Sequence, residues 1–368
     1  MSEAEALVTL NLLPGMGPVR IRRLISTLGS ARNALTASSR DIERIEGIGP
    51  NTARLISDWE NQANPESELA EAHKRGITII TSDCPSYPEP LSRIADSPIV
   101  LYVWGDLQER DRHALGIVGS RQLTHYGRQT ARKFAFHLAQ AGLTILSGLA
   151  RGIDTAAHEG ALAAQGRTVA VIGSGLLQLY PPENMPLAQK IANGGGAVIS
   201  EYPLHTRPDR KRFPQRNRVV AGWGTGLLVV ECPARSGALI TANLATEYNR
   251  NVYAIPGQLD RPTSQGCNNL IREGATLVTD PTQILEDFSN LPLFPSKSNG
   301  SPEEIPVATN LKIDEKSVYE VMEPGEEHTI DSLIEASGLQ PKTVSTVLLM
   351  LEMKHLVKAL PGQRYVKL

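Results

Sequence analysis

The stretch Leu115–Gly175 decides the fold of this chain. It contains three segments, LGIVGSRQLTHYG (115–127), TILSGLARGIDTAAH (144–158) and RTVAVIGSG (167–175). Each begins with a short apolar run and ends in a Gly/Ser turn. The first two then pass into helix-like sequence, and the third passes into a proline-rich loop. This alternation is typical of a parallel sheet built from βαβ units.

The three turns are expected to meet at one edge of that sheet, because the carboxyl ends of parallel strands lie along the same side. Small residues let a ligand approach the backbone, and free N–H groups at the following helix starts favour an anion. Two arginines also stand beside these turns. We therefore predict a phosphate-binding edge formed by Gly119, Ser120, Arg121, Ser147, Gly148, Arg151, Gly173, Ser174 and Gly175.

The composition is that of an ordinary globular protein. Of 368 residues, 41% are apolar and 21% are charged, and the formal net charge is −2. Any attraction for nucleic acid must therefore come from local clusters of charge. The sequence has no apolar run long enough to span a bilayer and no cationic, apolar leader, so we expect a cytoplasmic protein without membrane contact. Its three cysteines have no metal-ligand spacing, so we expect neither a metal site nor a disulfide framework.

Strand and helix signals alternate through the middle of the chain. The fold class we predict is α/β, with strands near 115–119, 143–147, 167–172, 196–200, 226–231, 251–254 and 276–278 and helices near 125–141, 153–165, 185–193, 237–249 and 281–288. Two strand-like pieces around a proline-rich connection, Ile77–Thr81 and Ile99–Trp104, are expected at a sheet edge. We place domain boundaries to give a helical domain at 1–65, a sheet domain at 66–288, a linker at 289–312 and a last domain at 313–368.

The first domain contains a near-repeat. Gly15-Met16-Gly17-Pro18 and Gly47-Ile48-Gly49-Pro50 each stand between apolar helical segments, with the proline suited to a first helical turn. This pattern resembles paired helix-hairpin-helix units, whose turn can offer N–H groups to a DNA phosphate. A small helical bundle that needs tight turns explains it equally well.

The last domain has the outline of a winged helix: three helical segments followed by two strand-like pieces. Its third helix carries few basic residues besides Lys342 and Lys354. A DNA-reading helix usually carries Arg, Asn or Gln. We therefore favour a protein-contact or accessory role for this domain.

A basic segment, TRPDRKRFPQRNRVVAG (206–222), stands out in a slightly acidic chain. Cationic side chains neutralise phosphates, and an aromatic ring stacks on an unpaired base, so this combination suits single-stranded nucleic acid. The residues we assign to binding are Arg210, Lys211, Arg212, Phe213, Arg216, Asn217 and Arg218. We expect Glu231 to pair with Arg216 or Arg218 as a structural group, and His158 to be a packed or hydrogen-bonded histidine.

Taken in order, several motifs resemble the DprA/Smf family of DNA-processing proteins. They are GSR (119–121) with YG (126–127), SGLARGIDTAAH, AVIGSGLLQLYPPEN, SEYP, FPQRNRVVAG, SGALITA and the final PG…NNLI..GA. The resemblance implies an extended Rossmann-like domain that binds single-stranded DNA, with the helical and winged-helix domains as accessories. It also implies a homodimer that loads RecA recombinase onto DNA coated by single-strand-binding protein, in natural transformation. The family often has Lys where Arg151 stands and usually has Thr where Cys267 stands.

The function we expect is non-enzymatic and needs no cofactor. One alternative is a Rossmann-like hydrolase that cleaves the N-glycosidic bond of nucleoside monophosphates; such enzymes carry a PGGxGT..E run, whereas this chain has GWGTGLLVVE. Dinucleotide-dependent redox chemistry is weaker still, because the first turn reads GSRQLT instead of GxGxxG. GxxxxGK[ST] is also absent, so ATP hydrolysis is unsupported.

Overall fold

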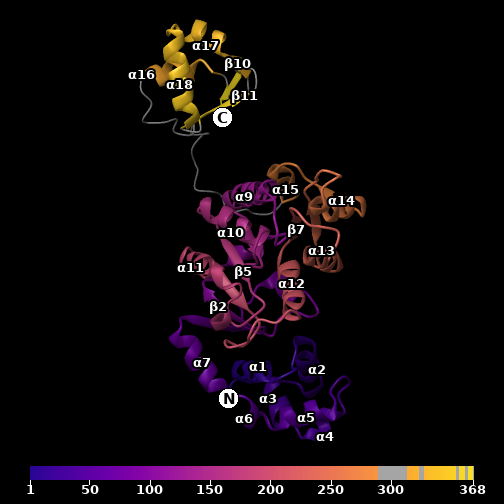
Figure 1. The fold of residues 1–368 in the computed structure, drawn as a ribbon. Helices are drawn as coiled ribbons and strands as arrows, with labels where there is room; N and C mark the ends of the chain where they lie inside the picture. Colours follow the sequence, from indigo (N-terminus) through magenta and orange to yellow (C-terminus); the bar gives the residue numbers. More distant parts are fainter. Residues whose placement is uncertain (289–312, 323–326, 354–355, 361–363, 368) are drawn as a thin grey trace. The chain divides into compact units, whose positions relative to one another are not determined.

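The computed structural model describes residues 1–288, 313–322, 327–353, 356–360 and 364–367 (Figure 1). The chain divides into two compact units, residues 1–296 and 297–368. The predicted linker, 289–312, lies outside the described residues. The boundary we placed between residues 65 and 66 falls inside the first unit and stays a prediction.

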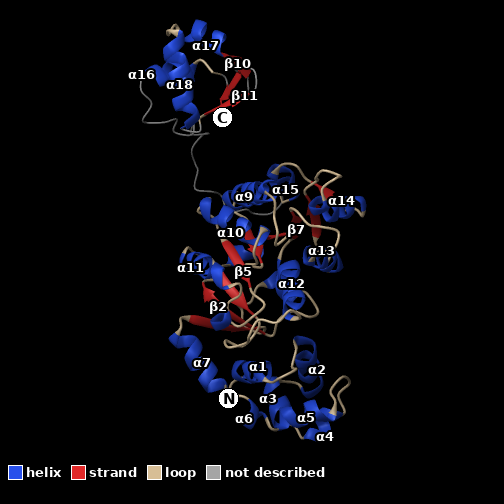
Figure 2. Cartoon of the chain, in the orientation of Figure 1, coloured by secondary structure: helices blue, strands red, loops and turns tan. Residues whose placement is uncertain are grey.

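The first unit is an α/β structure around one nine-stranded sheet (Figure 2). Its strands are β1 (Ile77–Thr81), β2 (Val100–Gly105), β3 (Ala114–Val118), β4 (Thr144–Ser147), β5 (Thr168–Val171), β6 (Ala197–Ser200), β7 (Gly226–Val229), β8 (Asn251–Ala254) and β9 (Thr276–Leu277). Its helices from residue 89 onward are α8 (Glu89–Ser92), α9 (His125–Gln140), α10 (Ile153–Ala163), α11 (Met185–Asn193), α12 (Arg212–Trp223), α13 (Gly237–Glu247), α14 (Gln265–Arg272) and α15 (Pro281–Asp287). The α/β prediction is confirmed, although α8, α12 and α14 are absent from the helices that we predicted.

The strands lie in the order β1-β2-β6-β5-β4-β3-β7-β8-β9. Strands β1 and β2 lie at one edge, as the prolines between them predicted; β2 is antiparallel to both of its neighbours, β1 and β6. The remaining strands, in the sheet order β6-β5-β4-β3-β7-β8-β9, are parallel to one another. The order reverses at β3, because β4, β5 and β6 follow on one side and β7, β8 and β9 on the other. Ligands of open α/β sheets bind outside the carboxyl ends of the strands at such a reversal.

The sheet is buried on both faces, which explains the continuous apolar runs of its central strands. Within β7, Leu227 and Val229 pack into one hydrophobic cluster, while Leu228 and the following Val230 pack into the cluster on the opposite face. Helices α12, α13 and α14 contribute to the first cluster, and α9, α10 and α15 contribute to the second. A rigid layered core of this kind fixes the positions of the turns at the strand ends.

The amino-terminal part of the first unit is helical. Its helices are α1 (Glu3–Leu12), α2 (Pro18–Leu28), α3 (Ala31–Thr36), α4 (Ser39–Glu43), α5 (Pro50–Ser57), α6 (Trp59–Gln62) and α7 (Pro65–Lys74). The two Gly-x-Gly-Pro copies behave alike: α2 and α5 both begin at the proline, after a glycine N-cap. The first glycine of each copy, Gly15 or Gly47, has a φ of +75° or +80°, which a side chain would strain. These helices share a hydrophobic cluster with β2, β5 and β6.

The second unit is a winged helix, as predicted. It contains α16 (Ile313–Glu320), β10 (Glu327–Thr329), α17 (Ile330–Ser337), α18 (Pro341–Met353), β11 (Val357–Leu360) and β12 (Arg364–Lys367). The strands form a sheet in the order β10-β12-β11. Lys342 is exposed at the start of α18, and Lys354 lies outside the described residues.

Candidate nucleic-acid interface

The turn after β3 is held closed by its own hydrogen bonds. The N–H of Ser120 donates to the carbonyl oxygen of Glu231 (2.6 Å), and its hydroxyl donates to the carbonyl oxygen of Gln122 (2.7 Å). A Cβ at Gly119 would come within 2.7 Å of the same Glu231 oxygen. The N–H of Ser120 is therefore not free for an anion. Arg121, by contrast, is exposed.

The turn after β4 is also closed. The hydroxyl of Ser147 donates to the carbonyl oxygen of Ile117 (2.6 Å). The N–H groups of Gly148 and Ala150 both donate to one carboxylate oxygen of Asp154, at 3.1 and 3.3 Å. Asp154 thus takes, from inside the protein, the place that we predicted for an external anion.

Arg216 lies against this turn from the other side. It is only 4% exposed, and its guanidinium donates to the carbonyl oxygen of Val171 at the end of β5. Burial raises the pKa of Asp154 and lowers that of Arg216, and in each case the opposite charge of the other group works against the shift. The two charges therefore support each other within the edge of the sheet.

Gly148 makes room for this buried arginine. A Cβ at Gly148 would lie 2.0 Å from Nη1 of Arg216. We expect Gly148→Val to lower the free energy of unfolding by about 1–3 kcal/mol, as overpacking does elsewhere. Denaturant unfolding measures this loss, with Gly237→Val, at a position with open space, as the control. A Gly148→Val protein that unfolds with the wild type contradicts the assignment.

The turn after β5 packs beneath an aromatic ring. A Cβ at Gly173 would lie 2.9 Å from Cδ1 of Phe213, so the glycine lets the ring approach the backbone. Ser174 is buried, and the N–H of Gly175 donates to the carbonyl oxygen of Thr206 (2.8 Å). Gly173 therefore supports the Phe213 ring, and the N–H of Gly175 is not free for an anion.

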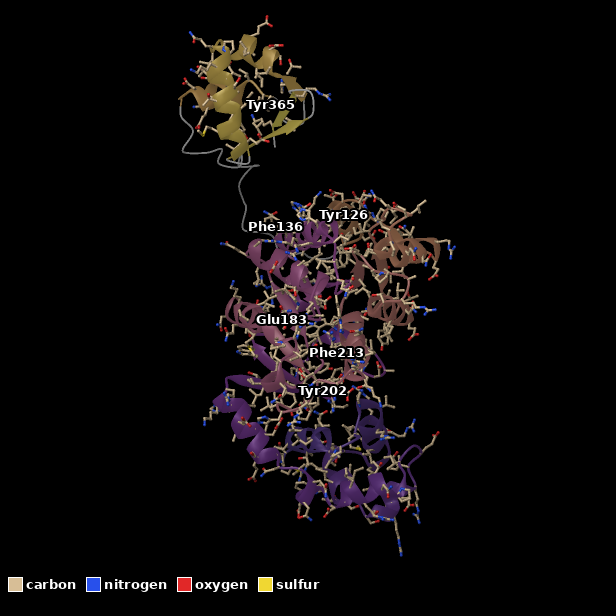
Figure 3. The ribbon with its side chains drawn as sticks, viewed as in Figure 1. Tyr126, Phe136, Glu183, Tyr202, Phe213 and Tyr365 are labelled. Atoms are coloured by element: carbon tan, nitrogen blue, oxygen red, sulfur yellow. The ribbon has the colours of Figure 1, made fainter. Side chains whose placement is uncertain are left out.

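Phe213, in the first turn of α12, is the centre of a small pocket at the carboxyl edge of the sheet. Figure 3 marks the position of Phe213 in the chain. Its ring centroid lies 5.7 Å from that of Tyr180, and the guanidinium carbon of Arg121 lies 5.3 Å from it. At the rim, Arg151 forms an exposed ion pair with Glu183. The residues that line this Phe213 pocket are Arg121, Gly148, Ala150, Arg151, Tyr180, Pro181, Phe213 and Arg216.

Three pocket residues were not assigned from the sequence, Ala150, Tyr180 and Pro181, and Tyr180 is the aromatic one. It is 37% exposed and follows β5 in the proline-rich loop. The sequence did contain a signal, since this loop leaves the same sheet edge as the glycine turns. An aromatic residue in such a loop is available for stacking.

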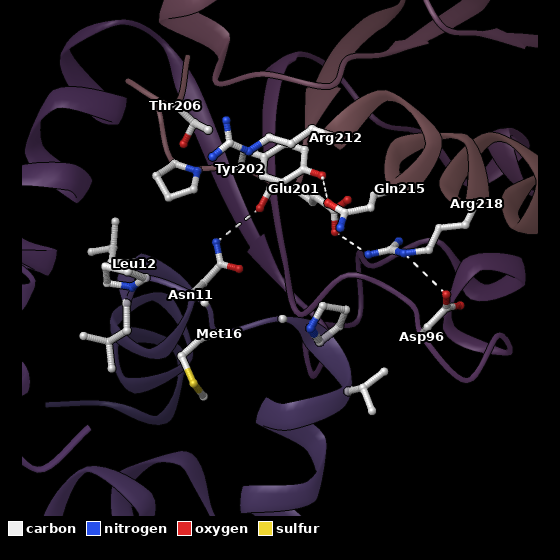
Figure 4. Close-up of a pocket in the computed structure, with 17 residues that line it drawn as sticks. Asn11, Leu12, Met16, Asp96, Glu201, Tyr202, Thr206, Arg212, Gln215 and Arg218 are labelled. Atoms are coloured by element: carbon white, nitrogen blue, oxygen red, sulfur yellow. Dashed lines mark hydrogen bonds and ion pairs between the residues drawn. The ribbon is translucent and has the colours of Figure 1, made fainter. Parts of the chain in front are cut away.

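The basic segment does not face one way. Helix α12 begins at Arg212, so the second half of the basic segment is helical. Its side chains therefore point to different sides of the helix, and residues three apart share a face. Arg218 is buried and pairs with Glu201 and with Asp96 (3.5 Å). The guanidinium carbon of Arg212 lies 5.5 Å from the ring centroid of Tyr202. Both arginines line a different cavity, of about 510 Å³, beside the turn between α1 and α2 (Figure 4).

The remaining predicted residues of this segment lie outside the Phe213 pocket. Arg210 and Lys211 are exposed just before α12. The side-chain amide of Asn217 donates to the carbonyl oxygen of Gly237 (3.4 Å). The structure therefore brings together five of the predicted binding residues: Arg121, Gly148, Arg151, Phe213 and Arg216.

The partners that we expected for Glu231 are wrong. Its carboxylate accepts hydrogen bonds from the N–H (3.0 Å) and the hydroxyl (3.2 Å) of Thr124 and does not pair with an arginine of α12. His158 is the packed histidine that we expected, with Nδ1 2.7 Å from the hydroxyl of Thr168. Burial, together with the nearby charge of Arg216, lowers the pKa of His158 to about 3.

Comparison with known proteins now adds to this geometry. Residues 78–289 match the family model of DNA recombination-mediator protein A, and residues 302–363 match that of the DprA winged helix domain. The chain is 35% identical to Protein Smf of Synechocystis, with 95% of each protein covered. It belongs to the DprA/Smf family. Protein Smf of Escherichia coli is 39% identical over 82% of this chain and 80% of its own length.

Two solved structures of the family resemble this one. The DNA processing protein A of Streptococcus pneumoniae matches with a TM-score of 0.68 and 33% identity, over 78% of this chain and 98% of that protein. The Helicobacter pylori protein, whose structure is described as giving insight into a single-stranded DNA binding mode, matches with a TM-score of 0.52 and 28% identity, over 58% of this chain and 95% of that one.

Two further properties concern only the described parts of the chain. None of the described helices has the length and apolar character to cross a membrane. Within the same residues, no group of three or more His, Cys, Asp or Glu side chains is placed to hold a metal ion.

Proposed function

We propose that this DprA/Smf protein binds single-stranded DNA at the Phe213 pocket and helps to load RecA recombinase onto it. The observation that carries the proposal is an aromatic pair, Phe213 and Tyr180, bordered by Arg121 and Arg151 at the carboxyl edge of the sheet. Rings that stack on bases beside guanidinium groups that neutralise phosphates are the usual means of holding an unpaired strand.

The roles of these side chains follow from their exposure. Arg121 and Arg151 are exposed, so each can reach a phosphate without the cost of desolvation. Arg151 already pairs with Glu183, and a phosphate would compete with that carboxylate. The buried Arg216 supports the pocket from below. Duplex DNA does not offer the unstacked base that the rings require.

The pocket must change to admit a base between its walls. Its free volume is only about 20 Å³, and Arg121 lies over the Phe213 ring. A base therefore either stacks against the rim at Tyr180 or takes the place of the Arg121 guanidinium on Phe213. In both arrangements the arginine stays close enough to pair with the neighbouring phosphate.

Removing Arg121 should reduce the number of phosphate contacts by one. We expect Arg121→Ala to weaken single-strand binding several-fold and to lower the slope of log K against log salt by about 0.7, the value for one phosphate on a single strand. Anisotropy titrations at several salt concentrations measure both. Arg32→Ala, which removes an exposed arginine on α3, is the matched control. An unchanged slope for Arg121→Ala would remove this residue from the interface.

Delivery to RecA and the dimer are further parts of the proposal. Both are supported by the family to which the chain belongs, because its family model is described as DNA recombination-mediator protein A. In a homodimer, two Phe213 pockets would hold one strand at two places and raise the effective affinity. We propose that the protein acts in this way in the cytoplasm, on DNA coated by single-strand-binding protein, during DNA uptake and recombination. The winged helix then has an accessory or protein-contact role.

The enzymatic alternative has less support, and we propose a protein that is not an enzyme. The GWGTG run that we compared with the hydrolase motif joins the end of α12 to the start of β7. It therefore precedes the strand, whereas the Phe213 pocket lies at the carboxyl ends of the strands. A phosphate held at that pocket would receive nothing from this run.

Fluorescence anisotropy with labelled single-stranded and duplex oligonucleotides, with nucleoside monophosphates as competitors, tests the binding proposal. We expect tight, salt-sensitive binding of the single strand. Equal affinity for duplex, or hydrolysis of a monophosphate, would contradict it. A RecA filament assay on DNA coated by single-strand-binding protein tests the loading step, where addition of this protein should shorten the lag.

A further inference from the structure

A third cavity lies on the other side of β3 from the Phe213 pocket. It has a volume of about 680 Å³ and is formed by the start of α9, the end of β7 and the segment after β8. We call it the Glu231 cavity. The residues that line it are Thr124, His125, Tyr126, Glu231, Pro256, Gly257, Gln258, Arg261, Thr263 and Ser264.

Glu231 gives this cavity a fixed hydrogen-bond acceptor. The residue is only 4% exposed, and Oε2 is held by the N–H and hydroxyl of Thr124. Among the described residues, no group donates a hydrogen bond to Oε1, the second oxygen. Gly127 leaves the space for the carboxylate, since a Cβ there would lie 1.9 Å from Oε2. The fold thus positions a carboxylate and leaves one oxygen available.

The walls of the cavity are suited to a flat ring. Tyr126 is 55% exposed, and its hydroxyl approaches the carbonyl oxygen of Pro256 (3.5 Å). The Pro256–Gly257 segment is held in place by Asn268, whose side-chain amide accepts a hydrogen bond from the N–H of Gly257 (3.1 Å) and donates one to its carbonyl oxygen (3.0 Å). Arg261, an exposed cation, bonds through Nε to the side-chain oxygen of Gln258 (3.2 Å).

These contacts account for sequence features that the Phe213 pocket does not use. Tyr126-Gly127 and the PG…NN pattern, with Pro256-Gly257 and Asn268, belong to the motifs of the central domain. In the structure all of them, together with Glu231, build this one cavity.

We propose that the Glu231 cavity binds a nucleobase that carries an amino group, with cytosine as the best-defined case. A carboxylate repels phosphate but accepts a hydrogen bond from the N4 amine of cytosine. Thymine has a carbonyl oxygen at that position, which would face the carboxylate without a hydrogen between them. The ring stacks on Tyr126, and Arg261 pairs with the attached phosphate.

This proposal rests on the proposed function when the base belongs to a DNA strand. Tyr126 and Phe213 lie apart in Figure 3, so the two sites would take different nucleotides of one strand. The same chemistry would also hold a free nucleotide. The second source is independent of strand binding, and the experiment separates the two.

The test uses the full chain and two labelled oligonucleotides, dC20 and dT20, in anisotropy titrations. We expect the wild type to bind dC20 about tenfold more tightly, the ratio for one hydrogen bond to a charged group. Glu231→Gln should remove or reverse this preference, because the two donors of Thr124 hold the amide oxygen and leave the NH2 group facing the base, where it donates to O4 of thymine but not to the N4 amine of cytosine. Phe213→Ala should weaken both oligonucleotides and keep the ratio. Titration calorimetry with dCMP and dTMP tests the free nucleotide.

Each outcome decides a part of the proposal. Loss of the ratio in Glu231→Gln, without dCMP binding, supports a base of the strand; dCMP binding that Tyr126→Ala abolishes supports a free nucleotide. Equal wild-type affinities for dC20 and dT20, with no dCMP binding, overturn the proposal. If no DNA binds at all, the proposed function fails and the dCMP titration alone decides the cavity. If Glu231→Gln melts early, Tyr126→Ala replaces it, because that side chain is exposed and its loss should remove the same ratio.

Discussion

Phe213→Ala should weaken binding of single-stranded DNA by about one to two orders of magnitude while leaving the protein folded. A stacked base contributes about 1–3 kcal/mol, and alanine removes the ring that Gly173 and Tyr180 hold in place. The melting temperature should change little, because Phe213 is only partly buried. Anisotropy titrations measure the affinity, and differential scanning calorimetry checks the fold.

The matched control for this substitution is Phe136→Ala. Phe136 is also partly buried, and it lies on α9 against the ring of His137, outside the Phe213 pocket (Figure 3). Its loss should leave DNA affinity unchanged. Phe213→Trp should keep most of the affinity, since stacking needs only a π-face. Equal affinities for Phe213→Ala and the wild type would exclude base stacking at this site.

The sheet could be predicted because its signals are local. Short apolar runs of the length of a strand predicted the strands from β3 to β9, and Gly/Ser turns marked the ends of β3, β4 and β5. The rule that parallel strands end on one side then predicted that Arg121, Gly148 and Arg151 converge, which the pocket bears out. Phe213 and Arg216 joined them because they follow the strand β6 in the chain.

The inward turn of Arg216 could not be predicted in the same way. A run of basic residues usually lies on a solvated surface, and nothing in the order of the residues marks one of these arginines as buried. In the structure α12 begins at Arg212, so Phe213 and Arg216 share the face toward the turns, while Arg212 and Arg218 line the other cavity. The partner Asp154 lies in a different βαβ unit, where its role depends on the assembled sheet.

The same limit explains the closed turns. Ser120 and Gly148 suggested free N–H groups, and the motif alone gives no sign that Glu231 and Asp154 supply acceptors for them. The glycines at positions 148 and 173 serve neighbouring side chains of α12 instead of a ligand. Contacts of this kind join segments that are far apart in the chain.

Arg216→Ala should lower the free energy of unfolding by about 1–3 kcal/mol, the usual cost of leaving a buried polar group without its compensation. The substitution leaves Asp154 in the same buried turn without the positive charge that opposes its burial. Denaturant unfolding at neutral pH measures the loss. Arg216→Ala with Asp154→Asn should recover part of the stability, because the amide still accepts a hydrogen bond from Gly148 and carries no charge.

The loss in Arg216→Ala should also depend on pH. Burial already raises the pKa of Asp154 in the folded protein, and removing Arg216 raises it further. An acid whose pKa is higher in the folded state holds its proton better there than in the unfolded chain, so it costs stability as pH rises from its unfolded pKa through its folded pKa. Below that interval the carboxyl is neutral in both states and needs no partner. The difference in stability between wild type and Arg216→Ala should therefore be largest near neutral pH and shrink toward acid pH. A difference that stays constant from pH 7.5 down to pH 4 would mean that Arg216 stabilises the edge by packing alone.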